Sequence, residues 1–275
     1  MNVLDHGEIV LLDWMPQRDL DAAVANAARV SHGVLQPDKG KNNRDLIRYL
    51  MRHHHTSPFE MVEFKWRIKA PIFVARQWVR HRTASWNEVS ARYTEMGDVE
   101  FYRPTTLRVQ SSTNKQTSSA GRIEDECVVR KLAVDAERDA AIAYAVALSS
   151  GVAREQARCV LPVSMYTEWI WKCDLHNTLG FLSQRLHPHA QEEIRVYAEC
   201  IYQRLKELCP ISVEAWEDFR LNAVTLTAPE VTAMRTGCLP ERATVREANE
   251  WAAKKESLQL DLWSNKPGVH RDSED

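Results

Sequence analysis

Glycine is scarce in this 275-residue chain, with nine residues in all, and the glycine-rich phosphate loops are missing. Neither GxGxxG, the dinucleotide fingerprint, nor GxxxxGK[ST], the triphosphate-binding loop, occurs in the sequence. A bound nucleotide would therefore have to be held by arginines, hydroxyl groups and helix N-termini instead.

An excess of charge of one sign is also missing, since the formal net charge is −2. Proteins dedicated to nucleic acids or membrane surfaces are usually basic, so both classes are disfavoured. No apolar run approaches the ~18 residues that a transmembrane helix needs. The N-terminal segment lacks the basic start and apolar core of a signal peptide. We therefore expect a cytoplasmic protein.

The six cysteines stand far apart and form no CxxC pair, which argues against a zinc site or a redox dithiol. In a reducing compartment we expect most of them to be core or near-core thiols. Three consecutive histidines, His53 to His55, point in different directions, so at most two could face one ion. We predict no metal site.

Hydrophobic periodicity predicts an α+β fold, with a few strands early and many helices late. Strict alternation over 61–69 indicates a half-buried strand, and 84–103 is expected to be extended. A further strand is predicted at 8–13, and helices at 17–32, 42–53, 72–81, 124–150, 152–159, 165–184, 189–208 and 240–257. Within 72–81 we expect Gln77, Arg80 and His81 to share one helical face.

The chain is expected to divide into a domain of residues 1–216 and a C-terminal extension, 217–275, of unknown role. The polar sequence SNKPGVHRDSED at its end is typical of a disordered tail. A stretch rich in Ser, Thr, Gln and Asn, 108–121, is typical of a mobile surface loop.

The densest functional pattern is RHRTASWNEVSARY, residues 80–93, with three arginines, a histidine, two serines, an asparagine and a glutamate. Guanidinium forks pair with phosphate in a bidentate manner, and Asn and Glu can bond the edge of a heterocycle. Composition alone leaves two interpretations equally open, an anion and base site or a charged solvated face.

The spacing of this stretch resembles RHRxxSxNExSxRY, the signature of the flavin-dependent thymidylate synthases, at all its fixed positions. These are Arg80, His81, Arg82, Ser85, Asn87, Glu88, Ser90, Arg92 and Tyr93. Segments 55–82, 112–119, 153–162 and 181–198 also resemble blocks of that family, in the same order. The resemblance covers roughly residues 8–215.

The resemblance implies an α+β fold with a central, mostly antiparallel sheet flanked by helices, assembled as a homotetramer with shared active sites. It implies reductive methylation of dUMP to dTMP. 5,10-Methylene-tetrahydrofolate would donate the carbon, FAD reduced by NADPH would donate hydride, and no enzyme nucleophile would add to the ring.

The resemblance also implies roles for individual residues. The expected FAD-binding residues are His55, Ser57, Arg80, His81, Arg82, Glu88, Asp174, Leu175, His176 and Gly180. The expected dUMP-binding residues are Gln77, Arg80, Glu88, Ser90, Ala91, Arg92, Arg158 and Arg185. Arg185 is the expected catalytic residue, because a permanent cation beside uracil favours the N3-deprotonated ring and makes C5 nucleophilic.

Some positions leave alternatives open. Ser90 could be a nucleophile, although a hydrogen bond to substrate is favoured because the sequence shows no triad around it. Gly180 stands where relatives commonly carry His or Asn, and Ala91 replaces a frequent glycine, which would strain a positive φ. Ser57 replaces a common threonine and keeps its hydroxyl. His187 and His189 are expected to pack at a helix start, and a flavin or substrate contact of His189 is the alternative.

Three rival functions remain at this point. The chain could bind flavin or nucleotide as a paralogue without turnover, an alternative that Gly180 leaves open. It could use its arginine cluster on nucleic acid, which the net charge of −2 disfavours. It could also be a related flavin enzyme with another pyrimidine as substrate.

Overall fold

A computed structural model describes residues 1–33, 42–97, 99–112 and 118–258. They belong to two compact units, Met1–Asn222 and Ala223–Asp275, so the first unit ends a little beyond the boundary expected at residue 216. The centre of the expected loop at 108–121 and the expected disordered tail lie outside the described residues.

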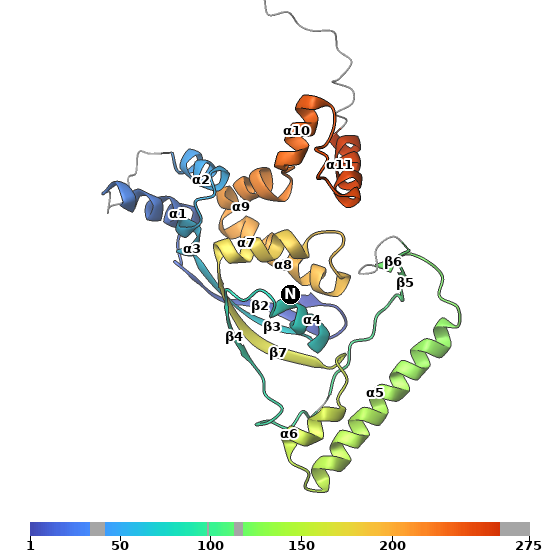
Figure 1. Ribbon diagram of the computed structural model, residues 1–275. Coiled ribbons are helices and arrows are strands. Elements are labelled where there is room, and N and C mark those ends of the chain that lie inside the picture. Colours follow the sequence, from blue (N-terminus) through green and yellow to red (C-terminus); the bar gives the residue numbers. More distant parts are fainter. Residues whose placement is uncertain (34–41, 98, 113–117, 259–275) are drawn as a thin grey trace, which may run out of the picture. The chain divides into compact units, whose positions relative to one another are not determined.

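The first unit is built on a five-stranded sheet in the order β1-β2-β3-β7-β4 (Figure 1). All its pairings are antiparallel, which confirms the expected α+β fold with a mostly antiparallel sheet. The strands are β1 (Asn2–Val3), β2 (Gly7–Met15), β3 (Glu63–Pro71), β7 (Tyr166–Asp174) and β4 (Ser85–Glu88). A separate hairpin pairs β5 (Val109–Gln110) with β6 (Ser118–Ser119).

Along the chain, the helices of the first unit lie between the strands of the sheet and after the last of them. They are α1 (Leu20–Arg29), α2 (Asn43–Arg52), α3 (Ser57–Glu60), α4 (Ile72–Trp78), α5 (Glu126–Ser149), α6 (Arg154–Ala157), α7 (Leu175–Arg185), α8 (Glu192–Leu208) and α9 (Pro210–Trp216). Short 3₁₀ turns follow α1 (Val30–His32) and α6 (Arg158–Val160), and a π-helical turn, η3 (Glu217–Leu221), follows α9.

The second unit contains α10 (Ala228–Thr236) and α11 (Val245–Leu258). Thr227 and Glu230 form a capping box at the start of α10, which satisfies two of its free backbone N–H groups. None of the helices in the described ranges is long and apolar enough to cross a membrane.

The core of the first unit centres on Trp78, the last residue of α4. Its ring lies 5.4 Å from Trp169 and Trp171 of the sheet, 4.6 Å from Phe181 of α7 and 6.0 Å from Tyr197 of α8. All five aromatic side chains are buried, and large aromatic contacts of this kind dominate core energetics. Trp78 therefore fixes the point at which the chain leaves the core and enters the arginine-rich stretch.

The predicted helix at 165–184 is wrong over its first half, which is strand β7. Trp169, Trp171 and Cys173 are buried while Ile170 and Lys172 between them are only partly covered, which is the period of two of a strand. Ile170 hides this alternation, because it joins Trp169 and Trp171 into one continuous apolar run. The second half is the helix α7, which begins where Asp174 caps it by accepting from Asn177 N at 2.8 Å.

Two other expectations need correction. The helix expected at 72–81 ends at Trp78, so Arg80 and His81 lie in the turn that follows and do not share a helical face with Gln77. The turn forms because His81 N donates to Trp78 O at 3.0 Å and closes the chain on itself. The cysteines are also less buried than expected, because Cys127, Cys159 and Cys238 are exposed.

Asp21 of α1 connects the two ends of the first unit. Its buried carboxylate accepts from Ile211 N at 2.9 Å, Ser212 N at 2.8 Å and Ser212 Oγ at 2.6 Å, at the first turn of α9. Asp21→Ala should lower the free energy of unfolding by about 2–4 kcal/mol, because three buried donors lose their acceptor. Urea unfolding measures this loss.

The matched control is Asp19→Ala. The exposed side chain of Asp19 caps α1 by accepting from Ala22 N at 2.9 Å, and its loss should cost about 1 kcal/mol. Equal costs for the two variants would contradict the assigned role of Asp21.

Candidate functional site

The C-terminal end of α7 holds Arg185 in a defined position. Its Nε donates to His81 Nε2 at 3.0 Å and its Nη2 donates to the carbonyl oxygen of Gln77 at 3.1 Å. The Gln77 side chain hydrogen-bonds to Gln191, just before α8. Three of the predicted site residues, Gln77, His81 and Arg185, are therefore brought together although 108 residues separate Gln77 from Arg185.

His81 is a neutral hydrogen-bond acceptor in this cluster. Its ring packs edge-on against Phe181 at 4.9 Å between centroids. Burial, helped by the Arg185 charge, lowers the pKa of His81 from 6.5 to about 4. The imidazole therefore stays unprotonated near neutral pH. Its Nε2 can accept the hydrogen bond from Arg185 Nε, and it adds no second positive charge beside Arg185.

Because the pKa of His81 is depressed in the folded state, acid should destabilise the protein through this residue. Between pH 6.5 and about 4 the unfolded chain binds a proton at His81 that the folded chain refuses. The stabilisation is complete above the unfolded pKa and is lost as the pH falls through this window.

Thermal unfolding of the parent protein and of His81→Gln between pH 7.5 and 4.5 measures the effect. His81→Gln should flatten the pH dependence of the melting temperature. Equal slopes for His81→Gln and the parent protein would contradict a neutral, half-buried His81.

Strand β4 carries Glu88 at the edge of the sheet. Thr167 Oγ1 donates to Glu88 Oε1 at 2.7 Å, and Trp86 Nε1 donates to Glu88 Oε2 at 3.2 Å. Trp86 stacks on Trp169 at 4.4 Å between ring centroids, which ties the strand to the core. The carboxylate is thus oriented while the residue remains exposed to a ligand.

A turn after β4 holds the next predicted residues, Ser90, Ala91 and Arg92. Arg92 N donates to Ser90 Oγ at 3.3 Å, and Tyr93 N and Thr94 N donate to Ser90 O, both at 3.0 Å. The strain considered for alanine does not arise, because Ala91 is not among the described residues with positive φ. Its backbone is therefore compatible with a side chain.

Arg92 lies near α6, since its Nη2 is 3.6 Å from Glu155 Oε2. Arg158, which directly follows α6, is exposed, and its side chain makes no hydrogen bond or ion pair within the described residues. Figure 1 shows α6 and α7 at well-separated places in the first unit. The predicted dUMP residues therefore form two clusters in one chain, one at Arg92 and Arg158 and one at Arg185.

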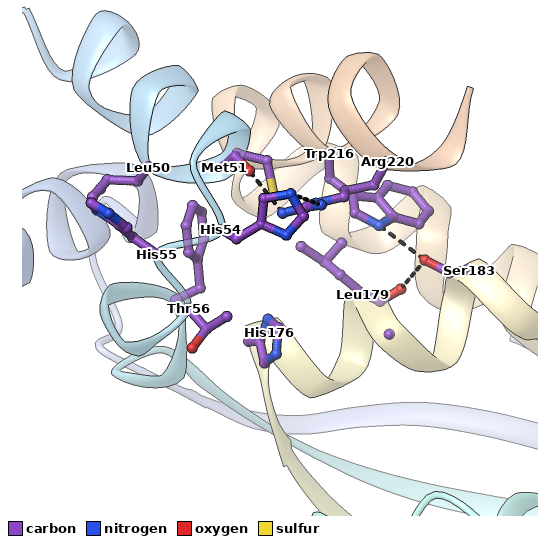
Figure 2. A pocket seen from close by; sticks show the side chains of 12 residues that line it. Leu50, Met51, His54, His55, Thr56, His176, Leu179, Ser183, Trp216 and Arg220 are labelled. Carbon is purple, nitrogen blue, oxygen red and sulfur yellow. Dashed lines mark hydrogen bonds between the residues drawn. The ribbon is translucent and has the colours of Figure 1, made fainter. Parts of the chain in front are cut away.

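A pocket of about 220 Å³ opens beside α7 and gathers three of the predicted flavin residues, His55, His176 and Gly180 (Figure 2). Leu50, Met51, His54, Thr56, Phe59, Leu179, Ser183, Trp216 and Arg220 complete its lining. A Cβ added at Gly180 would meet no atom within 4 Å, so this side of the pocket is open. Apolar walls with a few nitrogen donors are typical of cofactor sites.

A second pocket, of about 210 Å³, lies on the other side of Gly180. It is lined by His81, Arg82, Thr83, Cys173, Asn177, Gly180, Phe181 and Gln184. His81, Arg82 and Gly180 were predicted to bind flavin, so α7 carries predicted flavin residues on both sides. Cys173 lines the pocket with an unreactive thiol, since burial raises the pKa of this thiol to about 12.

Five further predicted flavin residues line neither pocket, and Glu88 on β4 is one of them. Asp174 is occupied as the cap of α7. The side chain of Leu175 is fully buried, and its backbone N–H donates to Val62 O at 2.8 Å. A flavin contact through the Leu175 side chain is therefore excluded. Ser57 begins α3 and is exposed, as is Arg80 after α4, and both are accessible to a ligand.

Sequence reasoning missed His54, Trp216 and Arg220 as pocket residues. The expected domain of residues 1–216 excludes Arg220, and the sequence does not distinguish His54 from the histidines beside it. Arg220 lies in η3, where no spacing pattern marks it, and only its hydrogen bonds to Met51 O at 3.0 Å and to His54 Nε2 at 2.8 Å reveal its place.

A third pocket of about 310 Å³ lies between the β5–β6 hairpin and the start of α8. Its lining includes Arg108, Ser118, Ser119, His189 and Gln191. Arg108 is anchored there by the buried Glu193, at 2.7 Å. Since Gln191 also bonds the Gln77 side chain, this pocket lies next to the Arg185 cluster. His189 faces a pocket in addition to standing at a helix entry.

Comparison with known proteins gives a consistent result. Residues 10–211 match the model of the family described as thymidylate synthase complementing protein. A flavin-dependent thymidylate synthase of Thermus thermophilus is 48% identical over 241 residues, which cover 87% of this chain and 86% of the relative. One from Dictyostelium discoideum is 42% identical and covers 94% of this chain and 87% of the relative.

Among solved structures, the UMP/dUMP methylase PolB from Streptomyces cacaoi bound with 5-Br UMP is similar, with a TM-score of 0.69 and 38% identity. The alignment covers 78% of this chain and 94% of PolB. The same protein bound with 5-Br dUMP gives a TM-score of 0.70 at 36% identity and covers 80% of this chain and 98% of PolB.

Proposed function

The chain belongs to the flavin-dependent thymidylate synthases, and from this premise we propose that it converts dUMP to dTMP in the cytoplasm. The proposed carbon donor is 5,10-methylene-tetrahydrofolate, and the proposed reductant is FAD that NADPH has reduced. The single observation that carries the proposal is the cluster of Arg185, His81 and Gln77, which presents a fixed cation beside the signature residues.

The residues around α7 fit a flavin. Two pockets flank Gly180, with His55, His176 and Arg220 in one and His81 and Arg82 in the other. These side chains offer donors to phosphate and heterocycle oxygens, while Phe59, Trp216 and Phe181 offer apolar and aromatic surface. When bound and reduced, FAD supplies the hydride, and the protein supplies position and charge.

Arg185 is the proposed activator of the pyrimidine. Burial lowers the pKa of its guanidinium below the usual 12.5. An arginine nevertheless stays protonated in a protein, so the positive charge remains. Nε and Nη2 are committed to His81 and Gln77, so Nη1 can contact the uracil N3 and its neighbouring carbonyl. A cation there stabilises the N3-deprotonated ring and raises the electron density at C5, without any group adding to C6.

Arg92, Arg158 and Ser90 are the proposed phosphate end of the dUMP site. The Arg158 side chain is exposed and makes no hydrogen bond or ion pair within the described ranges. The Arg92 guanidinium is 3.6 Å from Glu155 and 5.8 Å from the centre of the Tyr93 ring. Both guanidiniums can therefore turn to a 5′-phosphate. Glu88, which is held by Thr167, is the proposed acceptor for the base or the flavin edge.

Ser90 is proposed as a binding residue, because its Oγ accepts from Arg92 N and, among the described residues, no His or Lys hydrogen-bonds to it. Ser90→Ala should therefore raise the KM for dUMP by about 10-fold, equal to one hydrogen bond, and leave measurable turnover. Steady-state kinetics with dUMP measure both constants. Complete loss of turnover with intact dUMP binding would point to covalent catalysis instead.

We also propose that the enzyme is a homotetramer whose active sites combine residues of different chains. The two dUMP clusters lie apart in one chain, and a pocket of about 220 Å³ is smaller than typical sites of ~300–1,000 Å³. In addition, α5 exposes Val128, Leu132, Ile142 and Val146 on one face. An apolar stripe of this kind is expected to be covered by another chain.

A second candidate substrate is UMP, because the similar PolB is described as a UMP/dUMP methylase. Chromatography of the purified protein with dUMP, UMP or dCMP, each with the full set of cofactors, separates the possibilities. We expect dTMP as the main product. If UMP reacts faster than dUMP, UMP is the substrate instead. If none of the three compounds gives a product, the protein is a paralogue that binds ligands without turnover.

A further inference from the structure

Arg220 is a half-buried cation that lacks a counter-charge. Within the described residues it makes no ion pair, and its two hydrogen bonds go to neutral acceptors, Met51 O and His54 Nε2. Both acids of its own turn are already engaged, since Glu217 is 3.2 Å from Lys206 and Asp218 is 2.8 Å from Arg48. A guanidinium in such surroundings favours a bound anion.

The guanidinium lines the pocket that contains His55 and His176 (Figure 2). Its hydrogen bond fixes the imidazole of His54, which then presents its Nδ1 side, because arginine is always the donor. Three histidines and one arginine thus surround a single opening, and no carboxylate lines it among the residues described. The electrostatic character of this pocket is positive.

Two backbone irregularities place these groups. His54 has a φ of 63°, a conformation that costs energy in residues other than glycine. Arg220 lies in the π-helical turn η3, where Asn222 N donates to Glu217 O at 2.9 Å, and such turns are frequent at functional sites. Trp216, four residues earlier, lines the same pocket, and its Nε1 donates to Ser183 Oγ at 3.2 Å.

We propose that Arg220, with His54 and His176, forms an anion subsite that binds the diphosphate of the flavin cofactor. The inference rests on the proposed flavin dependence and extends the cofactor site into η3, beyond residues 10–211 of the family match. Arg220 holds the loop of His54 through Met51 O and lines the pocket. The diphosphate supplies the missing counter-charge.

The test compares ligands with and without phosphate on the full-length protein. Binding of FAD and of riboflavin is measured by flavin fluorescence for the parent protein, Arg220→Gln and Arg220→Lys. Arg220→Gln should lower the affinity for FAD by about 10- to 100-fold, as expected for a lost charge-assisted contact. The affinity for riboflavin should be unchanged. Arg220→Lys, which keeps the charge and loses the fork, should lie between the parent and Arg220→Gln.

The control is Arg52→Gln. Arg52 is exposed at the end of α2, 6.0 Å from the Phe219 ring, and does not line the pocket, so its loss should leave FAD binding unchanged. A loss of FAD and riboflavin affinity by equal factors in Arg220→Gln would show a purely structural role and overturn the proposal. If Arg220→Gln keeps its FAD affinity but has a raised KM for the folate, the subsite binds the folate carboxylates. That result would also overturn the proposal.

Competition by ADP, a diphosphate without flavin, separates this inference from the proposed function. If the parent protein binds no flavin, the proposed function fails. The anion subsite then stands only if ADP binds the parent protein at least 10-fold more tightly than Arg220→Gln. Equal ADP affinities for the two proteins would overturn the subsite itself.

Discussion

Replacing Arg185 with methionine should lower dTMP formation by about 10²- to 10³-fold while FAD remains bound. The guanidinium is positioned by His81 Nε2 at 3.0 Å and Gln77 O at 3.1 Å, so its charge is in place before the substrate arrives. Methionine keeps much of the side-chain volume and removes the charge. The uracil ring would then lose the cation that favours its N3-deprotonated form.

The measurement is single-turnover formation of dTMP at saturating dUMP, with the flavin absorbance of each preparation recorded first. Arg204→Met on α8 is the control, because Arg204 pairs only with Glu207 on the protein surface. Arg204→Met should react at the rate of the parent protein. Turnover of Arg185→Met within threefold of the parent would remove Arg185 from the proposed mechanism.

Placing two glutamates on α5, at Leu132 and Ile142, should dissociate the assembly and abolish most of the activity. These side chains are 63% and 54% exposed, and they share a face with Val128 and Val146. The opposite face of α5 holds the buried residues Glu137 and Tyr144, which bond Arg103 Nε at 2.9 Å and Met96 N at 3.1 Å. The apolar stripe therefore points away from its own chain.

Light scattering after size-exclusion chromatography measures the mass, and the dTMP assay measures the consequence. Val134→Glu is a matched control, because Val134 lies two residues from Leu132 and points to a different side of the helix. It should leave a tetramer. A Leu132→Glu/Ile142→Glu protein that remains tetrameric and active would exclude this stripe as the contact between chains. A parent protein that is monomeric and active would exclude shared active sites.

Sequence pattern predicted the elements in which burial follows one clear period. Strand β3 alternates Phe64, Trp66 and Ile68 with charged residues, and the long helix at 124–150 is also confirmed. The pattern failed at β7, because Ile170 stands between Trp169 and Trp171 and interrupts the alternation that distinguishes a strand from a buried helix. Fold class could be predicted, whereas this boundary depends on which neighbours cover the second face.

The candidate site was predictable in its residue types and only partly in its arrangement. The signature indicated Arg80 to Tyr93, but the pairing of Arg185 with His81 arises from the packing of α7 against α4. Arg220 could not be predicted, since a lone arginine in an unpatterned segment carries no signal until the fold places it beside His54. Spatial proximity across 166 residues is a property of the tertiary structure.

The central claim is that this chain makes dTMP from dUMP in a reaction that depends on flavin. Its most direct test is chromatographic detection of dTMP with dUMP, FAD, NADPH and methylene-tetrahydrofolate present, and with each of the four omitted in turn. We expect dTMP in the complete mixture, and none from flavin-free protein when any one component is missing. A folded, flavin-loaded protein that makes no dTMP in the complete mixture would contradict it.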